Sequence, residues 1–214
     1  MEALILYFVL FFPGVLILSS PDWLAQGAGA VLHFSMLREL GHSVTYTLPS
    51  FALLLYLISD KKGVSSLKEI CPTQKDILPF VIGLPVLIII GMFIAFLVSL
   101  FVTIPPPPRI EGPHNFVGWV VVVLACLGTG YLEELYFRYY LLSRMEKAVP
   151  QAAVRVIFST ILFAFIHDSP WGIVNAAIAG LFLSALFLKF RSLHGIALAH
   201  AGYNMFVYFM GTAA

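Results

Sequence analysis

The sequence predicts an all-α protein, a bundle of helices that crosses a membrane about seven times. Its 214 residues are 60% hydrophobic and only 11% charged, and their mean hydropathy is +0.96. A soluble domain carries about 25% charged residues. A chain of this length could not bury so much apolar surface in water, which excludes a soluble globular protein. The net charge of +1 and the lack of a basic cluster give no indication of nucleic-acid binding.

Seven apolar segments are long enough to span a bilayer, since a spanning helix needs about 20 mostly apolar residues. They lie near residues 3–19, 43–59, 77–103, 116–142, 153–168, 172–189 and 194–211. The four prolines at 105–108 predict a stiff extended loop. Residues 22–40 are apolar enough to lie on the membrane surface or to form an eighth span. No internal repeat or soluble segment interrupts the chain, so residues 1–214 are expected to form one integral-membrane domain.

Lysine and arginine are concentrated in alternate loops, and this bias sets the orientation of a membrane protein. Residues 60–75 hold four lysines, and basic residues also follow the fourth and the sixth predicted spans. The intervening loops are poor in basic residues. The N-terminus is therefore predicted to be cytoplasmic and the C-terminus to lie outside. If residues 22–40 span the membrane, the N-terminus moves outside and the rest keeps its orientation.

Three of the predicted spans carry polar side chains at mid-membrane depth. These residues are Glu133, Glu134 and Arg138 in the fourth span, His167 in the fifth, and His200 and Asn204 in the last. Ionisable groups in hydrocarbon are costly, so such a cluster indicates a functional site. A helical rise of ~1.5 Å per residue, counted from the cytoplasmic loops, places them in one layer roughly 10–21 Å deep.

Helical spacing separates the two adjacent glutamates. Glu134 and Arg138 are four residues apart and can pair on one helix face, in the favourable acid-first order. Glu133 points about 100° away and has no basic residue four positions on, so it is the better candidate for a general base. His200 and Asn204 share a face and can donate hydrogen bonds to a developing oxyanion. The structural alternatives are an ion pair for both glutamates and helix packing for a single membrane histidine.

Three motifs occur in order on successive segments: Glu133-Glu134-x-x-x-Arg138, Phe163-x-x-x-His167 and His200-x-x-x-Asn204. Together they resemble the CAAX protease and bacteriocin-processing (CPBP, or Abi) family of intramembrane proteases, over roughly residues 116–211. The resemblance implies that Glu133 activates water as general base and that His167 helps to hold that water. It also implies that His200 and Asn204 stabilise the oxyanion and that Glu134 with Arg138 braces the site.

The family has been described both as metal-dependent and as glutamate-dependent without metal. The chain lacks the His-Glu-x-x-His arrangement that puts two zinc ligands on one helix face. Glu133, His167 and His200 could still supply three zinc ligands and leave water in the fourth position. Cys71 and Cys126 are too few and too far apart for a cysteine-based zinc site. We favour the metal-free alternative, with no cofactor.

The resemblance implies a substrate that is a membrane-associated protein or peptide precursor, cut near its C-terminus. The small size of the chain indicates a bacterial or archaeal plasma-membrane protein, for which a precursor or sorting tail is a better expectation than a prenylated CaaX protein. Two alternatives come from other classes. A proton-coupled transporter would use the same residue types, but the chain shows no inverted repeat. A non-catalytic scaffold is disfavoured by the complete set of motifs.

Overall fold

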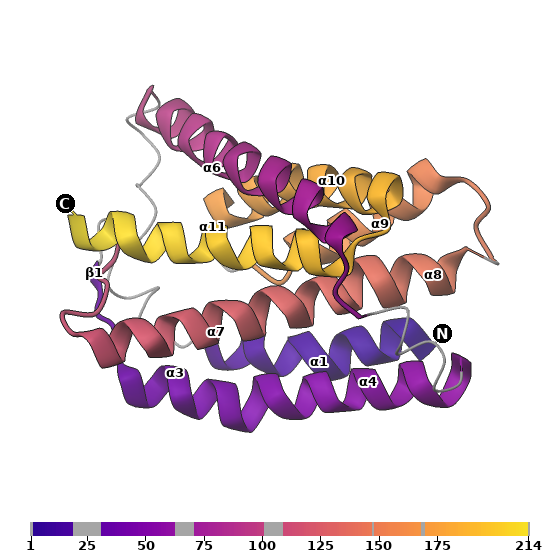
Figure 1. The fold of residues 1–214 in the computed structure, drawn as a ribbon, viewed down its shortest axis with the longest axis horizontal. Helices are drawn as coiled ribbons and strands as arrows, with labels where there is room; N and C mark the ends of the chain where they lie inside the picture. Colours follow the sequence, from indigo (N-terminus) through magenta and orange to yellow (C-terminus); the bar gives the residue numbers. More distant parts are fainter. Residues whose placement is uncertain are drawn as a thin grey trace.

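The structure, a computed structural model, describes residues 2–18, 31–62, 71–100, 109–146, 148–167 and 170–213. In these ranges nearly all regular structure is helical, and the helices form long rods packed side by side (Figure 1). The two termini lie at opposite ends of this bundle. The only strands in the described part are β1 (Val31–Leu32) and β2 (Arg109–Ile110), which pair in parallel. The predicted all-α helix bundle is therefore confirmed as a fold class.

Two rods come from the N-terminal part of the chain. The first is α1 (Glu2–Leu18), and the second joins α3 (Met36–His42), the π-helix η1 (Ser43–Thr47) and α4 (Leu48–Lys62). The backbone passes between these three pieces in helical conformation, so the second rod is longer than the predicted span 43–59. Residues 31–35 are not helical. Residues 22–30 lie outside the described ranges. Because 31–35 are not helical, residues 22–40 do not form the one continuous helix that an eighth span would require.

The remaining elements follow in chain order. They are η2 (Gln74–Asp76), α6 (Ile77–Leu100), α7 (Phe116–Glu134), the π-helix η3 (Leu135–Leu141), α8 (Leu142–Met145), α9 (Ala152–Ala164), α10 (Pro170–Phe190) and α11 (Leu193–Ala213). α7, η3 and α8 form one rod, which begins where the Asn115 side chain accepts a hydrogen bond from Gly118 N at 2.7 Å. Such a cap satisfies an amide that the first helical turn leaves without a partner.

Within the described ranges, three helices are long and apolar enough to cross a membrane: Gln74–Leu97, Phe116–Met145 and Trp171–Phe190. α1 and α9 are apolar but shorter. The segment predicted at 153–168 is helical only as far as Ala164, so its helix is shorter than a bilayer requires. A membrane helix bundle is thus supported, whereas the count of seven spans stays a prediction. The prolines at 105–108 lie outside the described residues.

α7 runs through the middle of the bundle, with α11 on one side and α1 and the α3–α4 rod on the other (Figure 1). Gly130 makes the approach of α7 to α11 possible, because a Cβ there would lie 3.0 Å from Ala197 O and Ala201 N. On the opposite side, apolar residues of α1 form one buried cluster with residues 132–141 of the α7–η3 rod. The middle of the α7–η3–α8 rod is therefore enclosed by helices from both halves of the chain.

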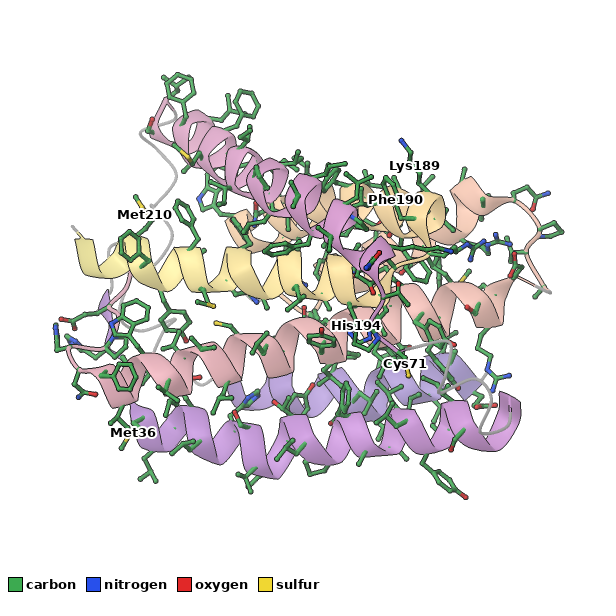
Figure 2. The ribbon with its side chains drawn as sticks, in the orientation of Figure 1. Met36, Cys71, Lys189, Phe190, His194 and Met210 are labelled. Carbon is green, nitrogen blue, oxygen red and sulfur yellow. The ribbon has the colours of Figure 1, made fainter. Side chains whose placement is uncertain are left out.

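Figure 2 shows Lys189 and Phe190 at one end of the bundle and Met36 and Met210 at the other. The N-terminus lies at the first of these ends and the C-terminus at the second. This arrangement is consistent with the predicted orientation, in which the basic loops are cytoplasmic. The orientation itself stays a prediction.

Candidate active site

Glu134 lies at the centre of a buried polar cluster between α7, η3 and α11. Its Oε1 atom accepts a hydrogen bond from Arg138 Nη1 at 2.9 Å and lies 2.9 Å from His200 Nδ1. The side chains of Glu134 and Arg138 are both 0% exposed. The pair predicted from spacing alone is present. The contact with His200 was not predicted, because it depends on how α7 packs against α11 near Gly130.

Glu133 approaches the other nitrogen of the same histidine. Its Oε2 atom lies 3.7 Å from His200 Nε2, which is longer than a hydrogen bond. The Glu133 side chain is 13% exposed and that of His200 is 8% exposed. His200 therefore lies between two carboxylates, with Nδ1 directed to Glu134 and Nε2 to Glu133. A separation above 3.5 Å between polar groups can be bridged by water.

Arg138 ties the cluster to α9 and α10. Its Nη2 atom donates to Gly180 O at 3.4 Å, and its Cζ atom lies 4.3 Å from the centre of the Phe163 ring. A cation over an aromatic face is attracted to the electron-rich ring. Gly180 is needed here, because a Cβ would lie 3.1 Å from Phe163 Cδ1 and 3.2 Å from Thr160 Cγ2. The close packing of α10 at Gly180 is thus explained by the space that Arg138 and Phe163 occupy.

The helix that carries these residues changes its winding at Glu134. α7 ends there and the π-helix η3 follows with Arg138 near its middle. π-helical turns are rare and are frequent at functional sites. The Ser159 hydroxyl of α9 donates to Phe137 O at 3.0 Å, which gives this part of η3 a partner from a neighbouring helix. The backbone that orients Glu134 and Arg138 is therefore held from outside as well as by its own hydrogen bonds.

His167 reaches the cluster through Phe163. Its ring meets the Phe163 ring edge to face at 5.1 Å, and the Phe163 ring meets that of His200 at 5.8 Å in the same manner. His167 Nδ1 lies 3.0 Å from Phe163 O. A carbonyl oxygen can only accept, so Nδ1 carries the proton, and in the neutral ring Nε2 is then the acceptor. His167 lies beyond the end of α9 and is half-buried.

Asn204 is half-buried one helical turn after His200 on α11. Its neighbour Tyr203 accepts a hydrogen bond from Asn175 Nδ2 of α10 at 3.0 Å. Asn175 is therefore an interhelical hydrogen bonder. This bond joins α10 and α11 beside Asn204.

Three histidines without a predicted function also have defined contacts. His194 Nδ1 lies 2.9 Å from the Tyr131 hydroxyl, and Figure 2 shows His194 beside the α7 rod. His33 and His114 both hydrogen-bond the Glu111 carboxylate, the latter at 3.2 Å. These bonds, chiefly that of His33, hold the pKa of the Glu111 carboxyl below its usual value. His33 and Glu111 directly follow β1 and β2, so this group joins two chain segments at the end of the bundle that holds the C-terminus (Figure 1).

No group of three or more His, Cys, Asp or Glu side chains in the described ranges is arranged to hold a metal ion. The alternative zinc ligands Glu133, His167 and His200 therefore do not form a metal site in this geometry. Neither cysteine takes part in a disulfide; Cys126 lies in the interior and Cys71 at the surface.

Residues 115–206 match the family model of the Rce1-like type II CAAX prenyl endopeptidases. This part of the chain is a Rce1-like CAAX endopeptidase domain. It extends from the residue that caps α7 into α11, and it contains every residue of the three motifs. The resemblance to the CAAX protease family is thereby confirmed, and the family is one of intramembrane proteases. No curated protein and no solved structure matches the chain.

The match favours a protease over the transporter and the scaffold considered from the sequence. It does not include α1 or the α3–α4 rod, which enclose the other side of the α7–η3 rod. The Rce1-like domain is thus packed against three rods that lie outside the matched segment: these two, and α6, which contacts α10 and α11.

Proposed function

We propose that the protein is an intramembrane endopeptidase in which Glu133 activates the hydrolytic water. The proposal rests on the different burial and hydrogen bonding of the two adjacent carboxylates, Glu133 and Glu134. Glu134 is fully buried and bonded by Arg138 and His200, so it is committed to the structure. Glu133 is partly exposed beside His200 Nε2. It is the carboxylate that can take a proton from water.

In the proposed reaction, Glu133 removes a proton from water while the water oxygen attacks the carbonyl carbon of the scissile peptide. The resulting tetrahedral intermediate carries its negative charge on the former carbonyl oxygen. When it collapses, the C–N bond breaks and the proton held by Glu133 passes to the leaving amine. His167, with Nε2 as acceptor in the neutral ring, would orient the attacking water.

His200 is proposed to stabilise the oxyanion together with Asn204. Since Nδ1 donates to Glu134, Nε2 can donate a second hydrogen bond only if the ring carries both protons. Charge balance supports this state, because two carboxylates and one arginine would otherwise leave a net negative charge in the buried cluster. A positioned donor of this kind stabilises a developing oxyanion far better inside a water-poor site than in water.

The proposed substrate is a membrane-associated protein or peptide precursor cut near its C-terminus. Glu133, Glu134 and Arg138 lie on the rod Phe116–Met145, which is long and apolar enough to cross a bilayer, so the scissile bond would enter at membrane depth. The proposed location is the plasma membrane of a prokaryote, with the N-terminus cytoplasmic and the C-terminus outside.

The test is a cleavage assay on the purified protein in lipid nanodiscs. The probes are a quenched fluorogenic peptide with a farnesylated cysteine in a C-terminal CAAX sequence, and an unlipidated peptide with an apolar C-terminal tail. Wild-type protein is expected to cleave one of them. Glu133→Gln should lose about 10²–10⁴-fold in kcat, the usual contribution of a general base. A chelator should leave the wild-type rate unchanged. Undiminished cleavage by Glu133→Gln would overturn the proposal.

A further inference from the structure

α9 ends inside the bundle, at the level of the candidate site. Its residue Phe163 contacts the His200 ring, and the helix ends at the next residue, Ala164. By contrast, α11 continues from His200 to Ala213, which is roughly 20 Å at ~1.5 Å per residue. Unlike a helix that ends at a membrane surface, α9 therefore ends where protein groups must provide the partners for its last carbonyl oxygens.

The hydrogen bonds at this helix end come from two sources. The residues that follow α9 provide three of them: Phe165 N donates to Ile161 O, His167 N to Ala164 O, and His167 Nδ1 to Phe163 O. The remaining carbonyl in this turn, that of Leu162, accepts a hydrogen bond from the Tyr7 hydroxyl of α1 at 3.0 Å. One side chain from outside the Rce1-like domain thus completes the cap beside His167.

Tyr7 is held firmly enough for its hydroxyl to define a position. The residue is 8% exposed, and its ring lies 5.9 Å from that of Phe11, 6.4 Å from that of Tyr136 and 6.3 Å from that of Phe137. The Phe137 ring in turn meets that of Phe163 at 5.2 Å. The ring of Tyr7 is therefore fixed against η3, the same segment that carries Arg138.

We propose that Tyr7 is a positioning residue for His167. Its hydroxyl fixes the last turn of α9, and that turn fixes the His167 ring through the bond from Nδ1 to Phe163 O. The direction of Nε2, which would hold the attacking water, then depends on α1. This inference rests on the proposed function of His167 and extends it to a helix that lies outside residues 115–206.

The test compares Tyr7→Phe with the matched control Tyr136→Phe. Both rings pack between α1 and η3, and each variant removes one hydroxyl and its bond to a carbonyl oxygen. The Tyr136 hydroxyl donates at 2.6 Å to Ala3 O, at the start of α1 and not at the end of α9. Loss of packing should therefore be similar in the two variants, whereas only Tyr7→Phe changes the cap of α9.

With a probe that wild-type protein cleaves, Tyr7→Phe should lower kcat about tenfold and leave KM unchanged, since small misplacements of catalytic groups reduce rates by such factors. Tyr136→Phe should keep kcat within about twofold on the same reasoning. A wild-type kcat in Tyr7→Phe, or an equal loss in both variants, would show that the hydroxyl does not position His167.

A second measurement needs no cleavage. Imidazole ¹⁵N spectra of protein with labelled histidine, with the His167 signal assigned by His167→Gln, should show one tautomer protonated at Nδ1 in wild type and in Tyr136→Phe. Tyr7→Phe should show a mixture. If no probe is cleaved by wild type, the proposed function fails, but these spectra still decide the inference. An unchanged single tautomer in Tyr7→Phe would overturn it.

Discussion

The two faces of the helix at the α7–η3 junction differ in almost every property that matters for chemistry. On one face, Glu134 is fully buried, bonded by Arg138 and His200, and linked through Arg138 to the carbonyl of Gly180. On the other, Glu133 is partly exposed and 3.7 Å from His200 Nε2. Two adjacent glutamates on one helix can therefore have different roles, one structural and the other, as proposed, catalytic. The decisive variable is the direction of each side chain, since residue type and depth are shared.

The difference between the two faces is tested most directly by removing one charge from each of them. Glu134→Gln should destabilise the protein by roughly 3–5 kcal/mol, because it leaves the buried Arg138 without its ionised partner. Glu133→Gln should cost clearly less than Glu134→Gln, since the Glu133 side chain keeps some exposure and its contact with His200 is longer than a hydrogen bond. Thermal unfolding of both variants in the same detergent measures the difference. Equal losses would mean that the two faces are not distinct.

The packing around Glu134 and Arg138 can be tested without changing any charge. Gly180→Ala places a Cβ 3.1 Å from Phe163 Cδ1 and 3.4 Å from Arg138 Nη2, so it should cost about 1–3 kcal/mol by overpacking. Cleavage should also slow, because Arg138 and Phe163 must shift. Gly41→Ala is the matched control, since nothing lies within 4 Å of the added Cβ in α3. The control should be neutral or stabilise by up to about 1 kcal/mol. If Gly180→Ala keeps both the stability and the cleavage rate of the wild type, the packing at Gly180 does not orient Arg138.

Features that depend on a single helix could be predicted from the sequence alone. The Glu134–Arg138 pair follows from a spacing of four residues, and the rods follow from apolar length. Contacts between helices could not be predicted in this way. His200 meets Glu134 because Gly130 allows α7 and α11 to approach closely, and spacing within either segment carries no information about that approach.

Helix ends and winding were also beyond prediction. Residues 153–166 are mostly apolar and contain no glycine or proline that would end a helix, yet α9 ends at Ala164, where Tyr7 and His167 provide its cap. The π-helices η1 and η3 require a change in hydrogen-bond register that apolar periodicity does not reveal. The paired strands β1 and β2 are two residues each, too short to show an alternating pattern.

The smallest effect is expected far from both faces, at Glu111. Its bonds with His33 and His114 hold its pKa below the usual value, so the ionised carboxylate stabilises the folded state. For an acid with a lowered pKa, this contribution is present above the unfolded-state pKa of about 4.3 and is lost as pH falls through the folded-state value. Glu111→Gln should therefore lower the thermal midpoint slightly at pH 6, and its difference from wild type should vanish in more acidic solution.

Cleavage at pH 7 should be unchanged, because α7 separates this carboxylate from Glu133 by roughly 25 Å at ~1.5 Å per residue. A loss of cleavage comparable to that of Gly180→Ala would instead show that the end of the bundle holding β1 and β2 is coupled to the site.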